Sequence, residues 1–371
     1  MRKLAHIERV LKIEPIENAD FIEKATILGW ECVTKKDELK EGDLCVYIEI
    51  DSILPDIPLF DFMRDRKFRV RTIKLKKQVS QGLALPLTSL LEFTNKTKWS
   101  EGDDVTDIMK IVKYDPQKAK EDKYRAIHKK KRNYLNEYMM SFAFYRKLRY
   151  KLGFNRMKNY PTFISKTDEE RIQNMPHILN QWGDMMYCTE KLDGCSATYA
   201  VYKDDDILFT KFRKSDFFVC SRNICLYREN NTEWWRVARE FGIKEKLLKV
   251  GKNIAVQGEI VGDGIQGNKY NYGQGKLDFF VYNVIDINTR KRYNYTEKKA
   301  FCEEYGFKMF PEPERRIGLN NVTVQKLVGL SKGKSLIYPK IHREGLVIRS
   351  LEDDHKSFKV INPDFLLKYG G

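Results

Sequence analysis

The feature that most constrains the fold is a series of β-forming segments separated by helical ones, which begins near residue 161 and continues to the end of the sequence. Four segments are rich in β-branched and aromatic residues: 254–261, 277–287, 346–349 and 357–361. Three have a helical pattern: 232–250, 295–305 and 322–328. A capping pattern at Thr167 and Glu170 predicts another helix start. This order of elements predicts an α+β domain, with helices packed outside antiparallel sheets.

Residues 1–113 are predicted to form a separate, small β-rich domain. The expected strands are 30–35, 44–51, 68–77, 81–87 and 105–112. Several short strands with a helix between them fit a small closed barrel of the OB type, which commonly binds nucleic acid. An SH3-like barrel fits the pattern nearly as well.

Positive charge is concentrated between the two predicted domains. The chain has 371 residues and a formal net charge of +16. Residues 120–158 contain 13 Lys or Arg against 3 Asp or Glu, a local excess of 13 − 3 = +10, with aromatic residues interleaved. We therefore assign 114–160 to a basic linker or insert and 161–371 to the second domain. Such charge suits a polyanion such as nucleic acid, although a solvated helical face explains this segment alone equally well.

The sequence has no feature typical of a secreted or membrane protein. No apolar run approaches the ~20 residues that span a bilayer, and the first residues lack the apolar part of a signal peptide. Seven cysteines, without a Cys-x-x-Cys pair, indicate reduced thiols in an intracellular compartment, cytoplasm or nucleus. The five histidines show no zinc-ligand spacing with these cysteines, so we expect no structural zinc.

Lys191 lies beside a tight turn formed by Asp193 and Gly194, between two short β-type runs at 185–187 and 197–202. A hairpin turn that carries a surface lysine is the simplest interpretation. A lysine is a nucleophile only after its ammonium loses a proton, and its ordinary pKa is about 10.4. Neighbouring groups that bind a metal or a phosphate can lower that pKa. Lys191 is therefore a candidate nucleophile if the chain supplies such groups.

Several polar and aromatic side chains downstream stand in or beside apolar strands. Arg222 and Asn223 follow an apolar strand, where they are suited to bind a phosphate or a ribose. Glu259 lies inside an apolar strand, and a buried carboxylate is costly without a partner. Phe280 and Tyr282 would share one face of a strand and could cover a base, although a core position explains each residue alone.

Two further segments continue the pattern. Glu344 lies at a turn before an apolar strand, and Lys359 lies within the predicted strand 357–361. Lys356, three residues earlier, would point to the opposite face of that strand. Each feature has a simple structural explanation, since Glu259 could pair with an arginine and Lys359 could extend from its strand to water. The ordered set is more specific than any one member.

Taken in order, these segments resemble the motifs of the covalent lysyl-nucleotidyltransferases, the superfamily of ATP-dependent DNA ligases, RNA ligases and mRNA capping enzymes. The six similar segments are 191–194, 221–223, 257–259, 280–284, 343–347 and 357–361. The closer similarity is to the Deinococcus–Naegleria type of RNA ligase and covers almost the whole chain. It includes 14–20, 40–47, 79–83, 166–174 and 257–269. The insert at 114–160 is longer and more basic than this family leads us to expect.

This resemblance implies an N-terminal OB-type barrel followed by an antiparallel-sheet α+β nucleotidyltransferase domain. The sequence ends ten residues after Ile361, so we expect no C-terminal OB domain of the kind usual in DNA ligases and capping enzymes. The implied enzyme is ATP-dependent and joins a 3′-OH RNA end to a 5′-phosphate end, at nicks during RNA repair. It would act through lysyl–AMP and RNA-adenylate intermediates. We expect RNA as its partner and a monomeric protein.

The resemblance also implies roles for individual residues. The catalytic set would be Lys191, Lys359, Glu259, Glu344 and Arg222. The nucleotide would be bound by Glu190, Asp193, Gly194, Arg222, Asn223, Phe280, Tyr282, Lys356 and Lys359. In that set Glu190 would recognise adenine, Tyr282 would stack on it, and Lys359 would contact the α-phosphate.

The resemblance further implies Mg²⁺ or Mn²⁺, held largely through water by Glu259, Glu344 and Asp193. The acids beside Lys191, these three and Glu190, would raise the pKa of the lysine and keep it a cation. A divalent cation among them reverses the local charge and disfavours the ammonium.

Three alternative functions are compatible with the sequence. Two belong to the same superfamily: a DNA nick ligase and a GTP-dependent capping guanylyltransferase. The third is a non-catalytic RNA-binding protein with an OB module and a degenerate transferase domain. The presence of Lys191, Glu259, Glu344 and Lys359 disfavours this third function.

Overall fold

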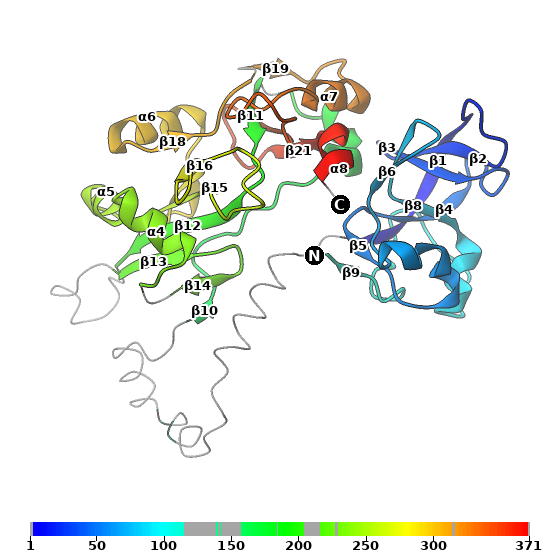
Figure 1. Cartoon of the computed structure of the whole chain (residues 1–371), viewed down its shortest axis with the longest axis horizontal. Coiled ribbons are helices and arrows are strands. Elements are labelled where there is room, and N and C mark those ends of the chain that lie inside the picture. Colours follow the sequence, from blue (N-terminus) through cyan, green and yellow to red (C-terminus); the bar gives the residue numbers. More distant parts are fainter. Residues whose placement is uncertain are drawn as a thin grey trace.

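The computed structural model describes residues 3–114, 139, 142, 157–183, 185–203, 216–226, 229–313 and 316–369. An N-terminal β-rich domain lies beside a larger α+β domain, and the C-terminal helix α8 (Pro363–Tyr369) lies on the side of the larger domain that faces the smaller one (Figure 1). Within the described residues, no helix is both long and apolar enough to cross a membrane. The seven cysteines are all buried, and none of them forms a disulfide.

The N-terminal domain is a curled antiparallel half-barrel. Its main sheet has the order β3-β2-β1-β4-β8. The strands of the domain are β1 (Ala5–Pro15), β2 (Ile22–Ile27), β3 (Trp30–Lys35), β4 (Leu44–Ile48), β5 (Ser52–Ile53), β6 (Thr72–Leu75), β7 (Gln78–Gln81), β8 (Leu83–Pro86) and β9 (Val112–Lys113). The sheet curls until β3 meets β7, where the backbone N–H of Val33 donates to Ser80 Oγ over 2.9 Å. The core inside this curl includes Ile7, Trp30 and Tyr47.

Not every predicted strand of this domain forms. The prediction for 30–35 is confirmed by β3, and 44–51 is confirmed up to Ile48. The segment 68–77 is wrong in length, because Phe68 has a left-handed backbone (φ 56°) and the strand begins only at Thr72. The segment 105–112 is wrong as a strand, because its backbone is mainly turns. The sequence did not predict β1 and β2 of the main sheet.

The larger domain contains two antiparallel sheets, apart from one parallel pairing of β16 with β18. The larger sheet has the order β10-β14-β13-β12-β15-β16-β17, and the smaller has the order β19-β11-β20-β21. The larger sheet consists of β10 (Met157–Asn159), β12 (Cys195–Tyr202), β13 (Asp216–Cys220), β14 (Ile224–Leu226), β15 (Ile254–Gly262), β16 (Leu277–Asp286), β17 (Lys291–Arg292) and β18 (Lys308–Met309). The smaller consists of β11 (Met185–Lys191), β19 (Ile317–Gly318), β20 (Gly345–Ser350) and β21 (Ser357–Ile361).

Helices pack on these sheets, as the sequence predicts for an α+β domain (Figure 1). The helices are α4 (Glu233–Glu240), α5 (Ile243–Lys249), α6 (Tyr295–Tyr305) and α7 (Val324–Ser331). The predicted single helix 232–250 is wrong in one respect, because Gly242 takes a left-handed conformation (φ 59°) and divides it into α4 and α5. The prediction of 295–305 is confirmed, and a capping box between Asn294 and Glu297 fixes where α6 begins.

The simplest interpretation of Lys191, a hairpin turn that carries a surface lysine, is wrong. β11 pairs with β19 and β20 in the smaller sheet, whereas β12 pairs with β13 and β15 in the larger one. Lys191 therefore ends a strand at a crossover between two sheets. At this crossover the chain passes so close to β15 that a Cβ on Gly194 would lie 2.3 Å from the carbonyl oxygen of Ile260. Only glycine permits that approach.

The helix predicted from Thr167 is also wrong. Residues 167–170 have no regular secondary structure, and only Ile172–Asn174 of this segment forms a 3₁₀ turn. The hydroxyl of Thr167 donates to Gln257 Oε1 over 2.7 Å, so it joins a tertiary contact and does not cap a helix. The basic insert predicted at 114–160 lies largely outside the described residues.

The two domains meet through a polar contact around Trp30. The indole of Trp30 donates to Asn174 Oδ1 over 2.6 Å, and the backbone N–H of Gly29 donates to the carbonyl of Gln173 over 3.0 Å. The guanidinium of Arg171 lies over the Trp30 ring and pairs with Asp51 at 3.2 Å. These bonds join the β2–β3 turn and Asp51 to the segment before β11, and they help to fix the position of the half-barrel on the larger domain.

His6 supports this contact from inside the half-barrel. His6 Nδ1 lies 2.7 Å from Glu8 and His6 Nε2 lies 3.7 Å from Glu49, whose carboxylate accepts a hydrogen bond from Asn174 of the larger domain. Burial alone would lower the pKa of His6, but its bonds to Glu49 and Glu8 outweigh that effect and raise the pKa to about 9. A charged His6 therefore compensates two buried carboxylates.

We predict that this histidine makes the stability of the protein depend on pH. The pKa of His6 is higher in the folded than in the unfolded chain, so its contribution is complete below about pH 6.5 and is lost as the pH rises through about 9. The shift corresponds to about 3 kcal/mol in the free energy of unfolding. Urea unfolding between pH 6 and 9 measures it. His6→Gln should lose much of this dependence, and His355→Gln, at an exposed position, should keep it. Equal pH slopes for wild type and His6→Gln would contradict the prediction.

Candidate active site

A pocket of about 470 Å³ lies where the two sheets of the larger domain meet the N-terminal domain. The N-terminal domain contributes Asp51, Arg69, Lys113 and Tyr114 to its walls. The larger domain contributes polar residues from several elements, which include Asp168, Lys191, Asp193, Arg222, Glu259, Glu344 and Lys359. Helix α8 closes one side with Phe365, Leu366 and Tyr369. Both domains therefore build one site.

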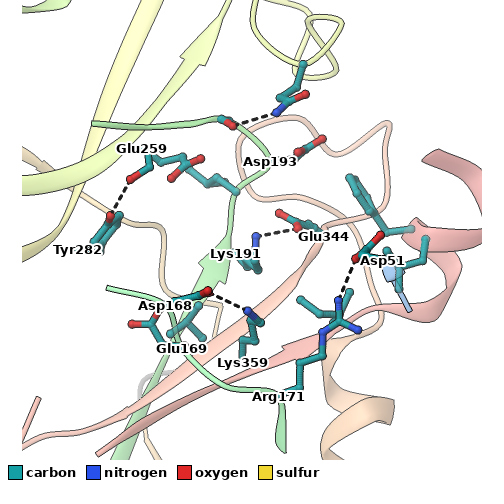
Figure 2. A pocket seen from close by; sticks show the side chains of 18 of the residues that line it. Asp51, Asp168, Glu169, Arg171, Lys191, Asp193, Glu259, Tyr282, Glu344 and Lys359 are labelled. Atoms are coloured by element: carbon teal, nitrogen blue, oxygen red, sulfur yellow. Dashed lines mark hydrogen bonds and ion pairs between the residues drawn. The ribbon is translucent and has the colours of Figure 1, made fainter. Parts of the chain in front are cut away.

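Lys191 is the last residue of β11 and points into this pocket (Figure 2). Its Nζ donates to Glu344 Oε1 over 2.6 Å. Glu344 directly precedes β20, whose first residue, Gly345, is the strand partner of Lys191. A Cβ on Gly345 would lie 2.2 Å from the carbonyl oxygen of Val360, so glycine is required for β20 to start this close to β21. The pairing of β11 with β20 thus brings Lys191 and Glu344 close enough to form their ion pair.

The charge state of Lys191 follows from its neighbours. Burial alone would lower the pKa of its ammonium, but the nearby carboxylates of Glu344, Glu259 and Asp193 outweigh that effect and raise the pKa. These acids are three of the four that the sequence predicts to do so. Among these carboxylates Lys191 is therefore an ammonium ion, and it can act as a nucleophile only after that proton is removed.

Glu259 lies on β15 opposite Phe280 of β16. A register shift follows Gln257, and Gly258 approaches β16 so closely that a Cβ there would lie 2.2 Å from the carbonyl oxygen of Phe280. Directly after this irregularity, the carboxylate of Glu259 lines the pocket, although the rest of β15 is buried. Burial, and then the charges of Glu344 and Asp193, raise the pKa of Glu259 to about 8, although Lys191 and Arg222 act in the opposite direction.

The carboxylates of this pocket suit a divalent cation bound through water. Oε2 of Glu344 is buried and has no hydrogen-bond partner, and burial raises the pKa of Glu259, so that a nearby positive charge would stabilise its carboxylate. Carboxylate oxygens are ligands that Mg²⁺ and Mn²⁺ prefer, and these carboxylates lack enough hydrogen bonds and cations to balance their charge. Among the described residues, no three acidic, histidine or cysteine side chains form a metal-binding cluster. Glu259, Glu344 and Asp193 therefore line the pocket without forming a preassembled direct coordination shell.

Three cations surround the carboxylate of Asp168 at another part of the pocket, and Figure 2 shows its ion pair with Lys359. Asp168 lies 2.7 Å from Arg222, 3.2 Å from Lys359 and 3.7 Å from Lys113 of the N-terminal domain. Burial would raise the pKa of Asp168, but the charges of Lys359, Arg222 and Lys113 hold it well below its usual range. Cations from three separate segments that converge on one anion can equally bind a phosphate.

The aromatic residues of β16 occupy two environments. Tyr282 lines the pocket, and its hydroxyl lies 3.1 Å from Ser196 Oγ. Phe280 is 8% exposed and lies in an apolar cluster with Leu192. Both rings contact Phe310, with centroid distances of 6.1 Å for Phe280 and 5.8 Å for Tyr282, as expected for two residues on one strand face. Phe310 also lines the pocket and was not predicted.

Four of the predicted nucleotide-binding residues do not line this pocket: Glu190, Asn223, Phe280 and Lys356. Glu190 is fully buried on the other face of β11, where its Oε2 accepts the backbone N–H of Leu336 over 2.7 Å. Asp193 and Gly194 do line the pocket, and Asp193 pairs with Lys269 at 2.5 Å. Lys356 precedes β21, whereas Lys359 within that strand faces the pocket.

Sequence reasoning missed several residues that shape the site. Arg349, at 4% exposure, donates to the carbonyl oxygen of Tyr282 over 2.6 Å and pairs with Glu169 at 2.6 Å. It therefore ties β20 of the smaller sheet to β16 of the larger one, and it also lines the pocket. An arginine at the end of an apolar strand was the available signal. Asp51 and Asp168 gave no local signal, because their partners are distant in sequence.

A buried ion pair supports Arg349 from behind. Lys298 of α6 and Asp354 are 1% and 3% exposed, and Lys298 Nζ lies 2.7 Å from Asp354 Oδ1. Lys298 also donates to the hydroxyl of Tyr187 on β11 over 2.9 Å. The second oxygen of Asp354 lies 3.7 Å from Arg349. This network connects α6 to the strands that carry Lys191 and Glu344.

We predict that Lys298→Met destabilises the protein strongly, because it leaves Asp354 buried without its closest cation. Removing one partner of a buried ion pair costs about 3–5 kcal/mol. Lys299→Met is a matched control on the same helix, since Lys299 is exposed and lies 4.0 Å from Glu303; such a pair contributes about 0.3–0.5 kcal/mol. Urea unfolding of both variants tests this. Similar losses in the two proteins would contradict the prediction.

Comparison with known proteins agrees with this fold. A protein-family model described as RNA ligase matches residues 184–361, and a second family model, described as an OB-fold domain, matches residues 4–87. The curated protein sequences give no match. The solved structures include several of Naegleria gruberi RNA ligase. A lysine-to-methionine mutant with AMP and Mn is 31% identical, with a TM-score of 0.77, and the match covers 100% of this chain and 99% of that one.

Two further structures of the Naegleria gruberi enzyme are as similar. The complex with PPi is 30% identical, with a TM-score of 0.78 and coverage of 100% of this chain and 99% of that one. A glutamate-to-alanine mutant with ATP and Mn is 31% identical, with a TM-score of 0.79 and full coverage of both chains. An OB-type domain followed by an α+β domain with a pocket lysine defines a nucleotidyltransferase of the ligase class. The chain belongs to the RNA ligase family, which confirms the fold class and the enzyme class predicted from the sequence.

Proposed function

We propose that this RNA ligase uses ATP and a divalent cation to join a 3′-OH RNA end to a 5′-phosphate end, at nicks in damaged RNA. The observation that carries the proposal is the position of Lys191, whose Nζ lies 2.6 Å from Glu344 in a pocket that also contains Glu259, Arg222 and Lys359. The Naegleria gruberi structures with ATP and Mn support the choice of nucleotide and cation.

In the first step, neutral Lys191 attacks the α-phosphorus of ATP. A nitrogen–phosphorus bond forms, the bond from the α-phosphorus to the bridging oxygen breaks, and pyrophosphate leaves. Lys359 and Arg222 are placed to compensate the charge on the phosphates, since both contact one carboxylate at the pocket wall. The product is a lysyl–AMP phosphoramidate.

The lysine must lose a proton before this step. A cation bound through water near Glu259, Glu344 and Asp193 would disfavour the ammonium and offset phosphate charge. Glu344, which accepts a hydrogen bond from Lys191 Nζ, would hold the amine in place. Asp193 is also held by Lys269, so its carboxylate is already partly compensated.

In the next two steps the AMP leaves Lys191. An oxygen of the RNA 5′-phosphate attacks the phosphorus of lysyl–AMP, which releases the lysine and gives RNA-adenylate. The 3′-OH of the other RNA end then attacks the 5′-phosphate, so that a phosphodiester forms and AMP is released. Tyr282, on the pocket wall, would stack on the adenine through these steps. Glu190 would need to act from behind β11, because its carboxylate is fully buried against Leu336.

We predict that Lys191→Ala abolishes a covalent AMP adduct and retains RNA binding, because the substitution removes only the nucleophile. The measurement is a denaturing gel after incubation with α-labelled ATP and Mg²⁺ or Mn²⁺. Lys244→Ala, an exposed lysine on α5, is the control and should form the adduct as wild type does. An adduct on Lys191→Ala would overturn the assignment.

The same assay separates the alternatives. Adduct formation with labelled GTP in place of ATP would indicate a capping enzyme, and no adduct with either nucleotide would indicate a non-catalytic protein. Sealing of nicked duplexes with RNA or DNA on the 3′-OH side then distinguishes an RNA ligase from a DNA ligase. We expect sealing only where the 3′-OH strand is RNA.

A further inference from the structure

The β6–β7 hairpin of the N-terminal domain is strongly basic and has no role in the pocket chemistry. From Arg66 to Lys77 the chain has seven basic residues in twelve and no acidic one. The seven are Arg66, Lys67, Arg69, Arg71, Lys74, Lys76 and Lys77. Among these, Lys74, Lys76 and Lys77 are exposed on the hairpin, and no acidic group of the described residues pairs with them. The nearest acid of the adjacent strand, Glu31, is paired with Lys24 at 3.5 Å.

The hairpin tip has an unfavourable sequence for its own backbone. Leu75 pairs with Gln78, so Lys76 and Lys77 form a two-residue turn, and both have left-handed backbones with φ of 46° and 68°. Such a turn strongly favours Asn-Gly, because each non-glycine residue in this conformation costs about 1 kcal/mol or more. Lysines at these two positions make the turn less stable than Asn-Gly would. What they add in return is positive charge at the hairpin tip.

The hairpin is anchored beside the active site. Ser80 of β7 binds the backbone of Val33, and β6 contacts helix α8 (Figure 1). Helix α8 also lines the pocket, and its Leu366 packs against the core of the N-terminal domain. Arg69, three residues before β6, itself lines the pocket. The basic segment therefore extends from the pocket wall outward to the hairpin tip.

The dimensions suit one strand of nucleic acid. Lys76 lies seven positions after Arg69, and at about 3.3 Å per residue this distance is at most about 23 Å. Phosphates on one strand are spaced about 3.4 Å along a duplex axis, so this reach corresponds to about seven nucleotides. Lysine is a compact, mobile cation that binds phosphate without selecting a base.

We infer that the β6–β7 hairpin binds the phosphate backbone of the RNA strand that flanks the joined ends, with Lys76 and Lys77 as its outermost contacts. This inference rests on the proposed function and extends it to a specific substrate-binding surface. The hairpin holds the RNA in register while the pocket adenylylates and joins its ends. It contributes nothing to the reaction of Lys191 with ATP.

The test replaces the turn by the sequence that its backbone favours. Lys76→Asn with Lys77→Gly removes two charges and relieves the backbone, so we expect a higher melting temperature together with weaker RNA binding. A structural role for the two lysines predicts the opposite change in stability. The control is Lys244→Gln with Lys249→Gln, which removes two exposed lysines from α5, on the far side of the larger domain (Figure 1).

The binding probe is a labelled, nicked RNA duplex with a 5′-phosphate, titrated at several salt concentrations. For the hairpin variant we expect affinity lower on the order of tenfold, and a plot of log K against log salt whose slope is less steep by about two. The control variant should match wild type in affinity and slope. RNA affinity and salt slope equal to wild type in the hairpin variant would overturn the inference.

Adduct formation from labelled ATP is measured on each protein first. If wild type forms no adduct, the proposed function fails whatever the binding result. If wild type forms the adduct and the hairpin variant binds and seals the nicked RNA as well as wild type, the proposed function stands and the inference about the hairpin fails.

Discussion

The ion pair between Lys191 and Glu344 is the interaction on which the rest of the site depends. A lysine ammonium among three carboxylates is stable only while those groups stay close, and the strand pairing of β11 with β20 keeps them so. The same carboxylates hold the proton that the nucleophile must lose. The carboxylates therefore keep Lys191 in its unreactive ammonium form. Conversion of Lys191 to a reactive amine requires positive charge to be added, or negative charge removed, nearby.

The other residues of the pocket come from separate structural units. Lys191 comes from the smaller sheet, Glu259 from the larger, and Lys113 and Asp51 from the half-barrel. Arg349 connects the two sheets, and the contacts of Trp30 with the segment before β11 hold the half-barrel against them. Much of the buried polar structure thus fixes the relative positions of charged groups from distant segments, at a cost in desolvation that apolar packing would avoid.

Sequence reasoning was successful where local chemistry decides the outcome. β21 and α6 were predicted from the local residue pattern of 357–361 and 295–305, and Glu259 and Glu344 were singled out because a carboxylate within or beside an apolar strand is costly without a partner. It failed where pairing decides. The turn residues after Lys191 suit a hairpin, but they do not determine which strands become neighbours, and the chain crosses between sheets instead. The cations around Asp168 likewise meet only in the folded chain.

The most direct test of the central claim is the protonation state of Lys191 itself. Reductive methylation of Lys191, measured by mass spectrometry as a function of pH, reports the fraction of neutral amine. Without a divalent cation, we expect Lys191 to be labelled only at a pH above that required by the exposed Lys244. Addition of Mn²⁺, or the substitution Glu344→Gln, should move the labelling of Lys191 to lower pH. Rapid labelling of Lys191 at neutral pH in the metal-free wild type, unchanged by Glu344→Gln, would contradict the account.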